Sequence, residues 1–415
     1  MDAAAARQDH ESNSILMLTA DRQIDRRILL QADSLEKAGW RVTILAMTDD
    51  DTERRDEPRV VRAGAGGQGG GREQQVAYGY RQLARRLPMN GAMMRSLKRL
   101  AWRFLVDQET FHARLYGDVA SRFAPRVVVA HDLPMLPVAS QVARGCAARL
   151  VYDSHELYSE QEFSARERRR WAEIEARYIG NCDAVMTINQ SIAGELARRH
   201  ALSQVHVISN AERATDATHS SRLFHELFGL PATRKILLFQ GGLSANRNLQ
   251  ALVAAMRHVK NPEIVLVILG DGALKQRLTR EARRQPGTQR VFFQAAVPQH
   301  ELLSHTAAAD AGVIPYRATC LNNYFCTPNK LFEFIAAGVP ILGSDLPEIR
   351  SMVAGRGIGL VGDMSSAPAV ASLIDELFGD EARLDFWREN LRQTRKAVCW
   401  EAEEGKLLAI YEALR

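Results

Sequence analysis

The sequence contains few cysteines and no long apolar run, and these absences exclude several kinds of protein. The five cysteines are scattered, and none belongs to a Cys-x-x-Cys pair, which argues against a disulfide framework and a structural zinc site. No stretch approaches the roughly 18 consecutive apolar residues that cross a bilayer, and the polar residues 1–14 lack the apolar core of a signal peptide. We therefore expect a cytoplasmic protein, with at most peripheral contact at the inner face of a membrane.

The length of the chain favours two domains. Its 415 residues exceed what one hydrophobic core usually organises. Hydrophobic residues make up 46% of the chain and charged residues 25%, a composition typical of folded proteins. The net charge of +5 favours anionic partners, but no nucleic-acid-binding motif accompanies the basic residues, so we expect no nucleic acid among them.

Short apolar runs alternate with longer helical patterns, and this alternation occurs twice. In the first half the runs are 15–18, 42–46, 127–130, 150–152 and 184–188. In the second half they are 236–239, 264–269, 291–293, 312–314 and 340–342. Such alternation is typical of parallel sheets covered by helices. The sequence therefore predicts an α/β protein with two doubly wound, Rossmann-like domains, which we place at residues 1–208 and 209–395.

The strongest ligand-binding motif is the segment 327–340, TPNKLFEFIAAGVP. We predict that Thr327 is the N-cap of a helix, that Pro328 is its first residue and that Gly338 ends it. A helix N-terminus attracts anions, and Lys330 in the first turn adds a positive charge. We therefore expect this helix to bind phosphate in a cleft between the two domains, where ligands of such sheets bind.

Other residues of this helix extend the predicted site. Glu333 lies three residues after Lys330, on the same helix face, where its carboxylate can accept hydrogen bonds from ribose hydroxyls. Thr327 and Asn329 begin the helix beside the expected phosphate. The alternative is an ordinary surface pair of Lys330 and Glu333 on a capped helix.

Two glycine-containing turns precede this helix in the second half. Gly241 and Gly242 follow one apolar run and precede Arg247. Glycine permits close approach of the backbone to a ligand, and arginine can bind a phosphate through two hydrogen bonds. Gly270 and Gly272 follow the next run and could form a wall of a nucleoside site, although Gly-x-Gly is equally typical of an ordinary turn.

Histidines and acids follow two apolar runs in the first half. His131 and His155 should both face the cleft, where an imidazole can exchange a proton or bind a sugar hydroxyl. Alternatively, each histidine caps a helix or binds a backbone group. Asp132, Asp153 and Glu156 can orient a histidine or bind acceptor hydroxyls, and each could equally be an N-cap.

Together these motifs resemble glycosyltransferase family 4, whose members are retaining enzymes of the GT-B fold. In that family a basic pair and two glutamates separated by seven residues bind a nucleotide sugar. Arg247 matches the second basic residue and Glu333 the second glutamate, whereas the first basic position falls on Gly242 and the first glutamate on Phe325. The resemblance also implies that His155 lies near the reacting centre.

The resemblance implies a role for each part of the chain. Residues 1–208 would bind the acceptor, residues 209–395 would bind the nucleotide sugar, and a helix at 396–415 would cross back to the first domain. That helix carries apolar residues at helical spacing, as docking requires. They are Leu407, Leu408, Tyr411 and Leu414.

The reaction implied is transfer of a sugar, a hexose or a related unit, from a nucleoside-diphosphate sugar to a hydroxyl acceptor with retention of configuration. The acceptor would be a lipid-linked or surface-polysaccharide glycan. His155, Arg247 and Lys330 would carry the catalysis without a metal ion or a further cofactor. Two other functions remain open: a sugar-nucleotide epimerase of similar architecture and a non-catalytic sugar-nucleotide-binding protein.

Four further segments carry weaker signals. Arg22, in the turn after the first run, suits an anionic acceptor, although solvated charges before a helix explain it almost as well. The basic segment 81–104 predicts an amphipathic helix that lies on anionic lipid or packs on its own domain. We expect a flexible loop at the glycine-rich 64–71 and a solvated loop, without a metal, at the acidic 49–51.

Overall fold

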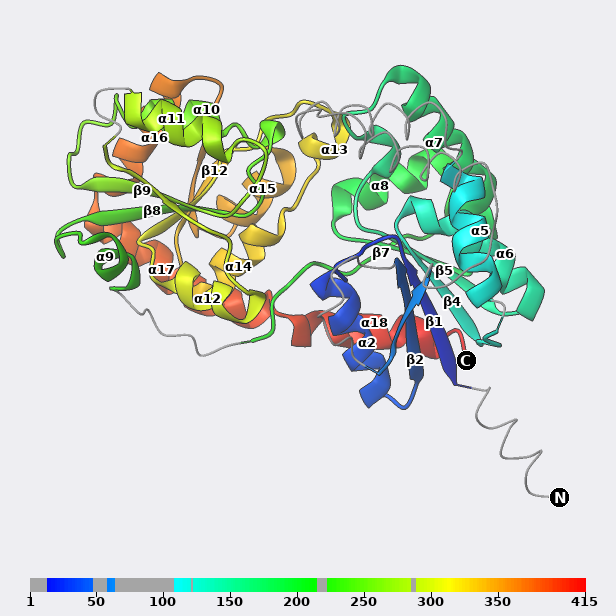
Figure 1. Cartoon of the computed structure of the whole chain (residues 1–415). Coiled ribbons are helices and arrows are strands. Elements are labelled where there is room, and N and C mark those ends of the chain that lie inside the picture. The colour runs from blue at the N-terminus through cyan, green and yellow to red at the C-terminus, as the bar shows by residue number, and fades with distance from the viewer. Residues whose placement is uncertain (1–12, 48–57, 64–107, 121, 215–221, 285–288) are drawn as a thin grey trace.

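The computed structural model describes residues 13–47, 58–63, 108–120, 122–214, 222–284 and 289–415 (Figure 1). The predicted segments at 49–51, 64–71 and 81–104 lie outside these residues. The described chain forms two parallel sheets, each surrounded by helices. The predicted pair of doubly wound α/β domains is therefore confirmed.

The first sheet has the strand order β3-β2-β1-β4-β5-β6-β7, with every neighbouring pair parallel. Side chains of β1 alternate between two apolar clusters, because successive residues of a strand point to opposite faces. Leu16 and Leu18 join one cluster, whereas Ile15 and Met17 join the other. The strands are β1 (Ser14–Thr19), β2 (Arg41–Met47), β3 (Val60–Ala63), β4 (Val127–His131), β5 (Arg149–Ser154), β6 (Ala184–Thr187) and β7 (His206–Val207).

The second sheet has the order β10-β9-β8-β11-β12-β13, again entirely parallel. The strand order reverses at β1 and β4 in the first sheet and at β8 and β11 in the second, and such switch points are where doubly wound sheets bind ligands. The strands are β8 (Lys235–Gln240), β9 (Ile264–Leu269), β10 (Val291–Gln294), β11 (Ala311–Ile314), β12 (Ile341–Ser344) and β13 (Gly359–Gly362).

Helices follow most strands and cover both faces of each sheet. Those of the first half are α2 (Arg26–Lys37), α5 (Gln108–Ala120), α6 (Leu136–Cys146), α7 (Ala165–Tyr178) and α8 (Gln190–His200). Those of the second half are α9 (Leu223–Phe228), α10 (Leu249–Ala255), α11 (Lys275–Arg284), α12 (Gln299–Ala307), α13 (Leu321–Tyr324), α14 (Asn329–Ala337), α15 (Pro347–Val353), α16 (Ala367–Phe378) and α17 (Glu381–Ala397).

Helix α14 begins one residue later than the sequence predicts. Pro328, not Thr327, occupies the N-cap, and no side chain caps the helix there. The Thr327 hydroxyl instead accepts a hydrogen bond from Asn189 Nδ2, at 3.2 Å. The predicted end is confirmed, since Gly338 takes a left-handed conformation with φ of 70°.

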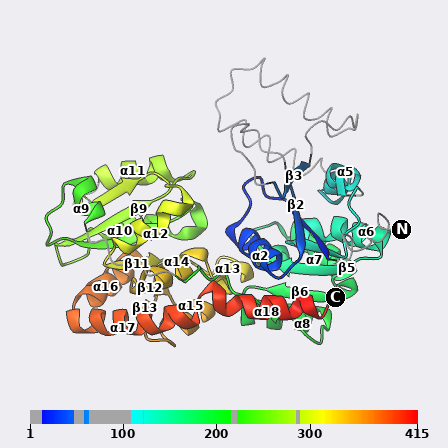
Figure 2. The ribbon, with the colours of Figure 1, turned by 90° about the horizontal axis from the view of Figure 1, so that it is seen from below.

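The last helix, α18 (Trp400–Glu412), packs against α2 in the first domain. Leu407, Tyr411 and Leu414 are buried in the same apolar cluster as β1 and α2. Figure 2 shows the C-terminal segment passing from α17, on the second domain, to this position on the first. The domain boundary at residue 208 stays a prediction; the last strand of the first sheet ends at Val207.

No helix among the described residues combines the length and the apolar character needed to cross a bilayer.

Candidate functional site

A cavity of about 840 Å³ lies between the two sheets. Its walls come from the segments that follow β1, β4, β5 and β6 in the first domain and β8, β9, β10 and β11 in the second. The predicted cleft therefore exists, and it lies at the switch points of both sheets. Eleven predicted site residues line it: Asp132, His155, Glu156, Gly241, Gly242, Arg247, Gly270, Thr327, Asn329, Lys330 and Glu333.

Four predicted site residues do not line the cavity: Arg22, His131, Asp153 and Gly272. His131 and Asp153 lie behind His155, almost completely buried. Arg22 is exposed on the loop after β1. Gly272 packs closely against the backbone of Leu243: a Cβ atom at position 272 would lie 2.6 Å from the Leu243 carbonyl oxygen.

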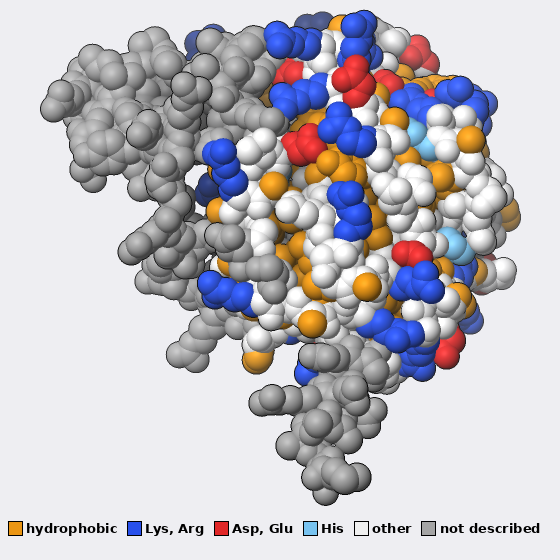
Figure 3. Space-filling model, turned by 90° about the vertical axis from the view of Figure 1, so that its right-hand side faces the viewer, with side chains coloured by type: hydrophobic (Ala, Val, Ile, Leu, Met, Phe, Trp, Pro, Cys, Tyr) orange, Lys and Arg blue, Asp and Glu red, His pale blue; other side chains and the backbone are white. Residues whose placement is uncertain are grey.

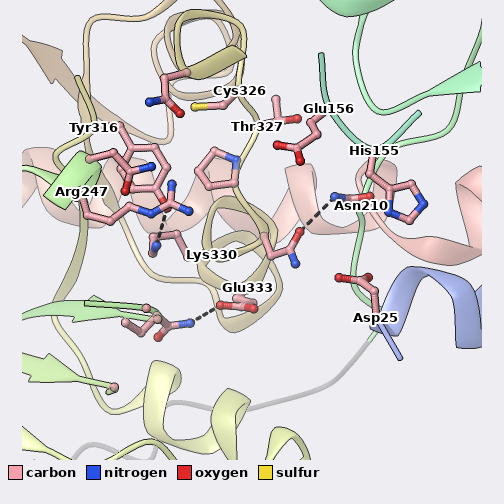
Figure 4. A pocket seen from close by; sticks show the side chains of 18 of the residues that line it. Asp25, His155, Glu156, Asn210, Arg247, Tyr316, Cys326, Thr327, Lys330 and Glu333 are labelled. Carbon is pink, nitrogen blue, oxygen red and sulfur yellow. Dashed lines mark hydrogen bonds between the residues drawn. The ribbon is translucent and has the colours of Figure 1, made fainter. Parts of the chain in front are cut away.

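Two cations converge on one wall of the cavity, around the ring of Tyr316 (Figure 4). The Arg247 guanidinium lies 4.1 Å from the ring centroid. Lys330 Nζ donates a hydrogen bond to the Tyr316 hydroxyl at 2.8 Å and lies 4.7 Å from the centroid of Phe239. The aromatic rings hold both cations in place. This wall can bind an anion with two positive groups at once.

Lys330 is buried, and burial makes its positive charge costly. Burial, together with the nearby positive charge of Arg247, lowers the pKa of Lys330 to about 7. An anion in the cavity would reverse this effect, since an opposite charge favours the protonated amine. The predicted full positive charge on Lys330 therefore depends on the ligand.

The N-terminal end of α14 places Glu333 beside the two cations. Its carboxylate accepts a hydrogen bond from Gln240 Nε2, and Arg26 Nη1 of the first domain lies 3.8 Å from its other oxygen. Gln240 in turn accepts a hydrogen bond from the Thr306 hydroxyl at 2.9 Å. The carboxylate is thus held rigidly at the cavity, with acceptor capacity for a ligand hydroxyl.

The turns after β8 and β9 require glycine at two positions. Gly241 has a φ of 114° and Gly270 a φ of 145°. A Cβ atom on Gly270 would lie 2.1 Å from the Gly241 carbonyl oxygen, so the two turns touch through their backbones. Gly242 differs, because a Cβ atom there would have no neighbour within 4 Å. Space therefore remains where family 4 has its first basic residue.

His155 is clamped between two carboxylates on the opposite wall. Its backbone N–H donates to Asp132 Oδ1 at 2.9 Å, and its Nε2 lies 3.3 Å from Asp153 Oδ2. Burial alone would lower the pKa of His155, but the two carboxylates outweigh it and raise the pKa to about 9. His155 is thus an imidazolium at neutral pH, which can donate hydrogen bonds to a ligand.

Asp153 supports His155 from behind. It forms an ion pair with Arg27, with a distance of 2.8 Å between Oδ1 and Nη2, and it also accepts a hydrogen bond from Gln31 Nε2 at 2.6 Å. Although burial alone would raise it, the pKa of Asp153 is held well below the usual value, chiefly by Arg27 and His155. Being fully buried, Asp153 orients His155 and cannot contact an acceptor directly.

His131, Asp153 and His155 are the one cluster of potential metal ligands within the described part of the chain, with one atom from each within 4.8 Å of the others. The Arg27 guanidinium already forms an ion pair with Asp153, and its positive charge would repel a metal ion at the same place. Burial lowers the pKa of His131, which keeps its ring neutral. The site residues thus suit a protein ion pair better than a metal, and a site without metal stays a prediction.

Helix α13 connects the second domain to the first across the cavity. Asn322 Oδ1 accepts the backbone N–H of Leu157 at 3.0 Å, and its Nδ2 donates to Glu156 Oε2 at 2.8 Å. Phe325 packs against an apolar cluster of the first domain, and its carbonyl oxygen accepts from Asn189 Nδ2 at 2.8 Å. The position of the family's first glutamate therefore serves contact between the domains.

Sequence reasoning missed several residues that shape the site. Tyr316, Gln240 and Asn322 carry no charge and belong to no motif, so nothing in the sequence distinguished them. Arg27 was visible in the basic turn after β1, but its partner Asp153 lies 126 residues away. Only the folded chain brings that pair together.

The fold is the GT-B fold, in which two doubly wound domains face each other across a cleft, and the paired cations define an anion site within it. Two family patterns match the chain: "Glycosyl transferase 4-like domain" at residues 24–211 and "Glycosyl transferases group 1" at residues 221–394. These matches place the chain in the superfamily of GT-B glycosyltransferases of group 1.

Individual relatives are distant. The chain is 25% identical over 183 residues to chitobiosyldiphosphodolichol beta-mannosyltransferase of Candida albicans, a match that covers 40% of each protein. It is 23% identical over 256 residues to D-inositol 3-phosphate glycosyltransferase of Xylanimonas cellulosilytica, covering 57% of this chain and 58% of that protein. The chain therefore matches only about half of these relatives' length.

A solved structure shows the same architecture. Anabaena HepE in complex with UDP-glucose superposes with a TM-score of 0.72 at 14% identity, covering 96% of this chain and 99% of that chain. At this identity the likeness concerns the fold alone.

Proposed function

We propose that this chain is a retaining glycosyltransferase that uses a nucleoside-diphosphate sugar as donor and a hydroxyl group of a glycan as acceptor. The observation that carries the proposal is the convergence of Arg247 and Lys330 on one wall of the cavity, at the N-terminal end of α14. A diphosphate is the ligand that two fixed cations beside a helix N-terminus suit best. The binding of UDP-glucose by HepE, which shares the fold, supports this choice of donor.

The proposed mechanism is stabilisation of the leaving group. The bond between the anomeric carbon and the diphosphate oxygen breaks, the acceptor oxygen bonds to that carbon, and the proton of the acceptor hydroxyl passes to the departing diphosphate. Negative charge develops on the diphosphate, where Arg247 and protonated Lys330 stabilise it. Glu333 would hold the ribose and Gly241 and Gly270 would admit the diphosphate close to the backbone. Retention is proposed from the resemblance to family 4.

The acceptor lies on the side of the first domain in this proposal. His155 and Asp132 face the cavity there, and the charges of Asp132 and Asp153 keep His155 protonated. A lipid-linked or surface-polysaccharide glycan is the proposed acceptor, with the protein in the cytoplasm or at the inner face of a membrane. Any lipid portion would remain outside the cleft.

The test begins with donor binding. We expect calorimetry with UDP, GDP and ADP to show one base preferred, and both Lys330→Met and Arg247→Gln to weaken that nucleotide. Each substitution should lower the turnover number for sugar transfer by about 10²–10³-fold, the loss typical of one removed oxyanion donor. The matched controls are Lys235→Met and Arg383→Gln, since Lys235 pairs with Glu381 and Arg383 stacks on Trp387 far from the cavity.

Near-normal transfer by both site variants would refute the proposal. Incubation of the nucleotide sugar without an acceptor separates the two other functions: epimerised sugar nucleotide would indicate an epimerase, and binding without transfer to any glycan a binding protein. The family matches favour transfer over epimerisation. Retention is read from the anomeric coupling constant of the product by proton NMR.

A further inference from the structure

The two walls of the cavity differ in charge. The second domain contributes Arg247 and Lys330, which the proposed function assigns to the diphosphate, together with the carboxylates of Asp271 and Glu333. The first domain contributes five carboxylates, and His155 is the sole cation that its described residues add to the lining. The carboxylates belong to Asp21, Asp25, Asp132, Glu156 and Glu162. The acceptor side of the cleft is therefore acidic.

Neutral groups hold three of these carboxylates, those of Glu156, Asp21 and Asp25, whereas Asp132 lies 3.6 Å from the His155 imidazolium. Glu156 accepts from Asn322 Nδ2 at 2.8 Å, and Asp21 accepts from the Thr19 hydroxyl at 3.1 Å. Asp25 caps α2 by accepting the N–H of Arg27 at 2.7 Å. Hydrogen bonds from amides and hydroxyls satisfy single lone pairs but do not neutralise a carboxylate.

The arginines nearest to this wall have other partners. Arg26 pairs with Glu212 and Arg27 with Asp153, and Arg22 lies on the same loop as Asp21 but does not line the cavity. The expected role of Arg22 in binding an anionic acceptor therefore finds no support in its position.

Burial makes the negative charge on this wall costly. It raises the pKa of Asp21 and of Glu156, and it raises the pKa of Asp132 to about 7, with the charges of Glu156 and Asp21 adding to the effect. Asp132 also has a φ of 63°, a strained conformation for a residue with a side chain and one that often accompanies function. These carboxylates are placed for a ligand that compensates their charge.

Basic side chains are abundant on the outside of the same domain. Figure 3 shows Lys and Arg side chains spread among apolar ones over the face on which α5, α6 and α7 lie in Figure 1. The exposed basic residues of α7 are Arg166, Arg168, Arg169, Arg170 and Arg177. The acidic cleft thus contrasts with the surface around it, and the overall charge of the protein does not describe its acceptor site.

From this contrast we infer that the reacting unit of the acceptor is a sugar with hydroxyl groups and a protonated amine, and with no phosphate or carboxylate. The inference rests on the proposed function, since it names the acceptor of that same site. Carboxylates such as Asp132 and Glu156 accept hydrogen bonds from sugar hydroxyls and form charge-assisted bonds to an ammonium group. A phosphate at the same place would face like charges at close range, which is strongly unfavourable.

The test compares three saccharides that differ at one group: methyl glucoside, its 2-amino derivative and its 6-phosphate. Each is titrated into the full-length protein saturated with UDP, so that the cations of the other wall are occupied, and dissociation constants are obtained by saturation-transfer NMR. We expect the amino sugar to bind about fivefold more tightly than the neutral sugar, and the phosphate at least tenfold more weakly than the neutral sugar. Any other order overturns the inference.

Isosteric variants identify the source of the preference. Asp132→Asn combined with Glu156→Gln should remove most of the advantage of the amino sugar, while the amide oxygen introduced by the first substitution can still accept the backbone N–H of His155. Asp271→Asn is the matched control, because Asp271 lines the cavity on the other wall and pairs with Lys275; the order of the three saccharides should not change. An unchanged preference in the double variant also overturns the inference. UDP binding, measured separately, tests the proposed function, so the two failures are distinguishable.

Discussion

Lys330 combines two properties that seldom coincide in one side chain: it is buried, and it faces a cavity built for an anion. The neighbouring rings of Tyr316 and Phe239 hold the amine but supply no full negative charge. Burial and the positive charge of Arg247 both disfavour the protonated amine of Lys330 in the free protein. The negative charge of a bound diphosphate favours the protonated amine, so binding and protonation of Lys330 should be coupled.

The first prediction follows from this coupling. With a pKa of about 7 in the free protein, Lys330 is largely neutral at pH 8, and a bound diphosphate raises that pKa. Binding must therefore take up a proton, and the affinity for UDP should fall as the pH rises from about 7 to 9, by up to tenfold per pH unit. Calorimetry at several pH values, in buffers of different ionisation enthalpy, measures both the affinity and the proton uptake.

Lys330→Arg is the informative comparison, because a guanidinium stays charged throughout this pH range. That variant should bind UDP with an affinity that hardly changes between pH 7 and 9, without proton uptake. If the affinity of the unmodified protein for UDP were equally independent of pH, Lys330 would already be protonated before UDP binds.

The predicted site residues that line the cavity are mostly those whose signal is local. Arg247 follows β8, and Lys330 and Glu333 belong to α14, the helix that follows β11 and α13, and strand ends in parallel sheets meet at one edge. Arg27 and Asp153 show the opposite case, because the role of each depends on a partner far away in the chain. The charge of a side chain likewise depends on its surroundings in the folded chain. Burial and the neighbouring Arg247 lower the pKa of Lys330, which the residue type alone does not reveal.

At the scale of elements, the ten apolar runs all became strands, because each has several consecutive apolar residues, and nine of them are mostly buried; the exception is β10, where only Val291 is buried. Three strands were not predicted. β7 has only two residues, β13 has a glycine at each end, and β3 is a partly exposed edge strand of four residues. Such short segments acquire strand structure from their neighbours, which a local pattern cannot reveal.

Helix α18 provides the second prediction, since it attaches the end of the chain to the first domain. Trp400 is completely buried, and its indole N–H donates to the Ser34 hydroxyl of α2 at 2.9 Å. Trp400→Ala should lower the free energy of unfolding by about 3–5 kcal/mol through the cavity that it leaves. Phe386→Ala, at a side chain that is 60% exposed on α17, should change it by less than about 0.5 kcal/mol.

Urea denaturation followed by circular dichroism measures both variants of this prediction. For Trp400→Ala, the unfolding transition of the first domain, to which α18 is docked, should shift to a lower urea concentration. Equal stability of the two variants would mean that the contact between α18 and α2 contributes little.

At the scale of the whole molecule, two sets of contacts hold the domains on either side of the cavity. One lies beside the connecting segment, where Arg26 Nη1 of the first domain lies 3.8 Å from Glu333 Oε1 and Asn210 Nδ2 of the connecting segment donates to Asn329 Oδ1 at 3.0 Å. The other lies at α13, where Asn322 bonds to the first domain and Phe325 packs against it. The two domains are thus in contact at both of these places. Only one of the two lies beside the segment that connects the domains along the chain.

The third prediction separates these two sets. Replacing Asn322 and Phe325 together by alanine removes the side-chain contacts of these two residues with the first domain but leaves the connecting segment and the donor-side cations intact. We expect the domains to move apart, which small-angle X-ray scattering would detect as a larger radius of gyration. The affinity for UDP should stay within about threefold of the unmodified protein, because Arg247 and Lys330 belong to one domain and keep their arrangement around Tyr316.

Transfer should respond differently from binding in the same double variant. The reaction requires the donor on one wall to meet an acceptor on the other, so loss of closure should lower the turnover number far more than the donor affinity. Leu227→Ala, at an exposed side chain of α9, should alter neither the scattering nor the turnover. If the double variant scattered like the unmodified protein and turned over normally, the contacts of α13 would not control closure, and the replacement of the family's first glutamate by Phe325 would need another explanation.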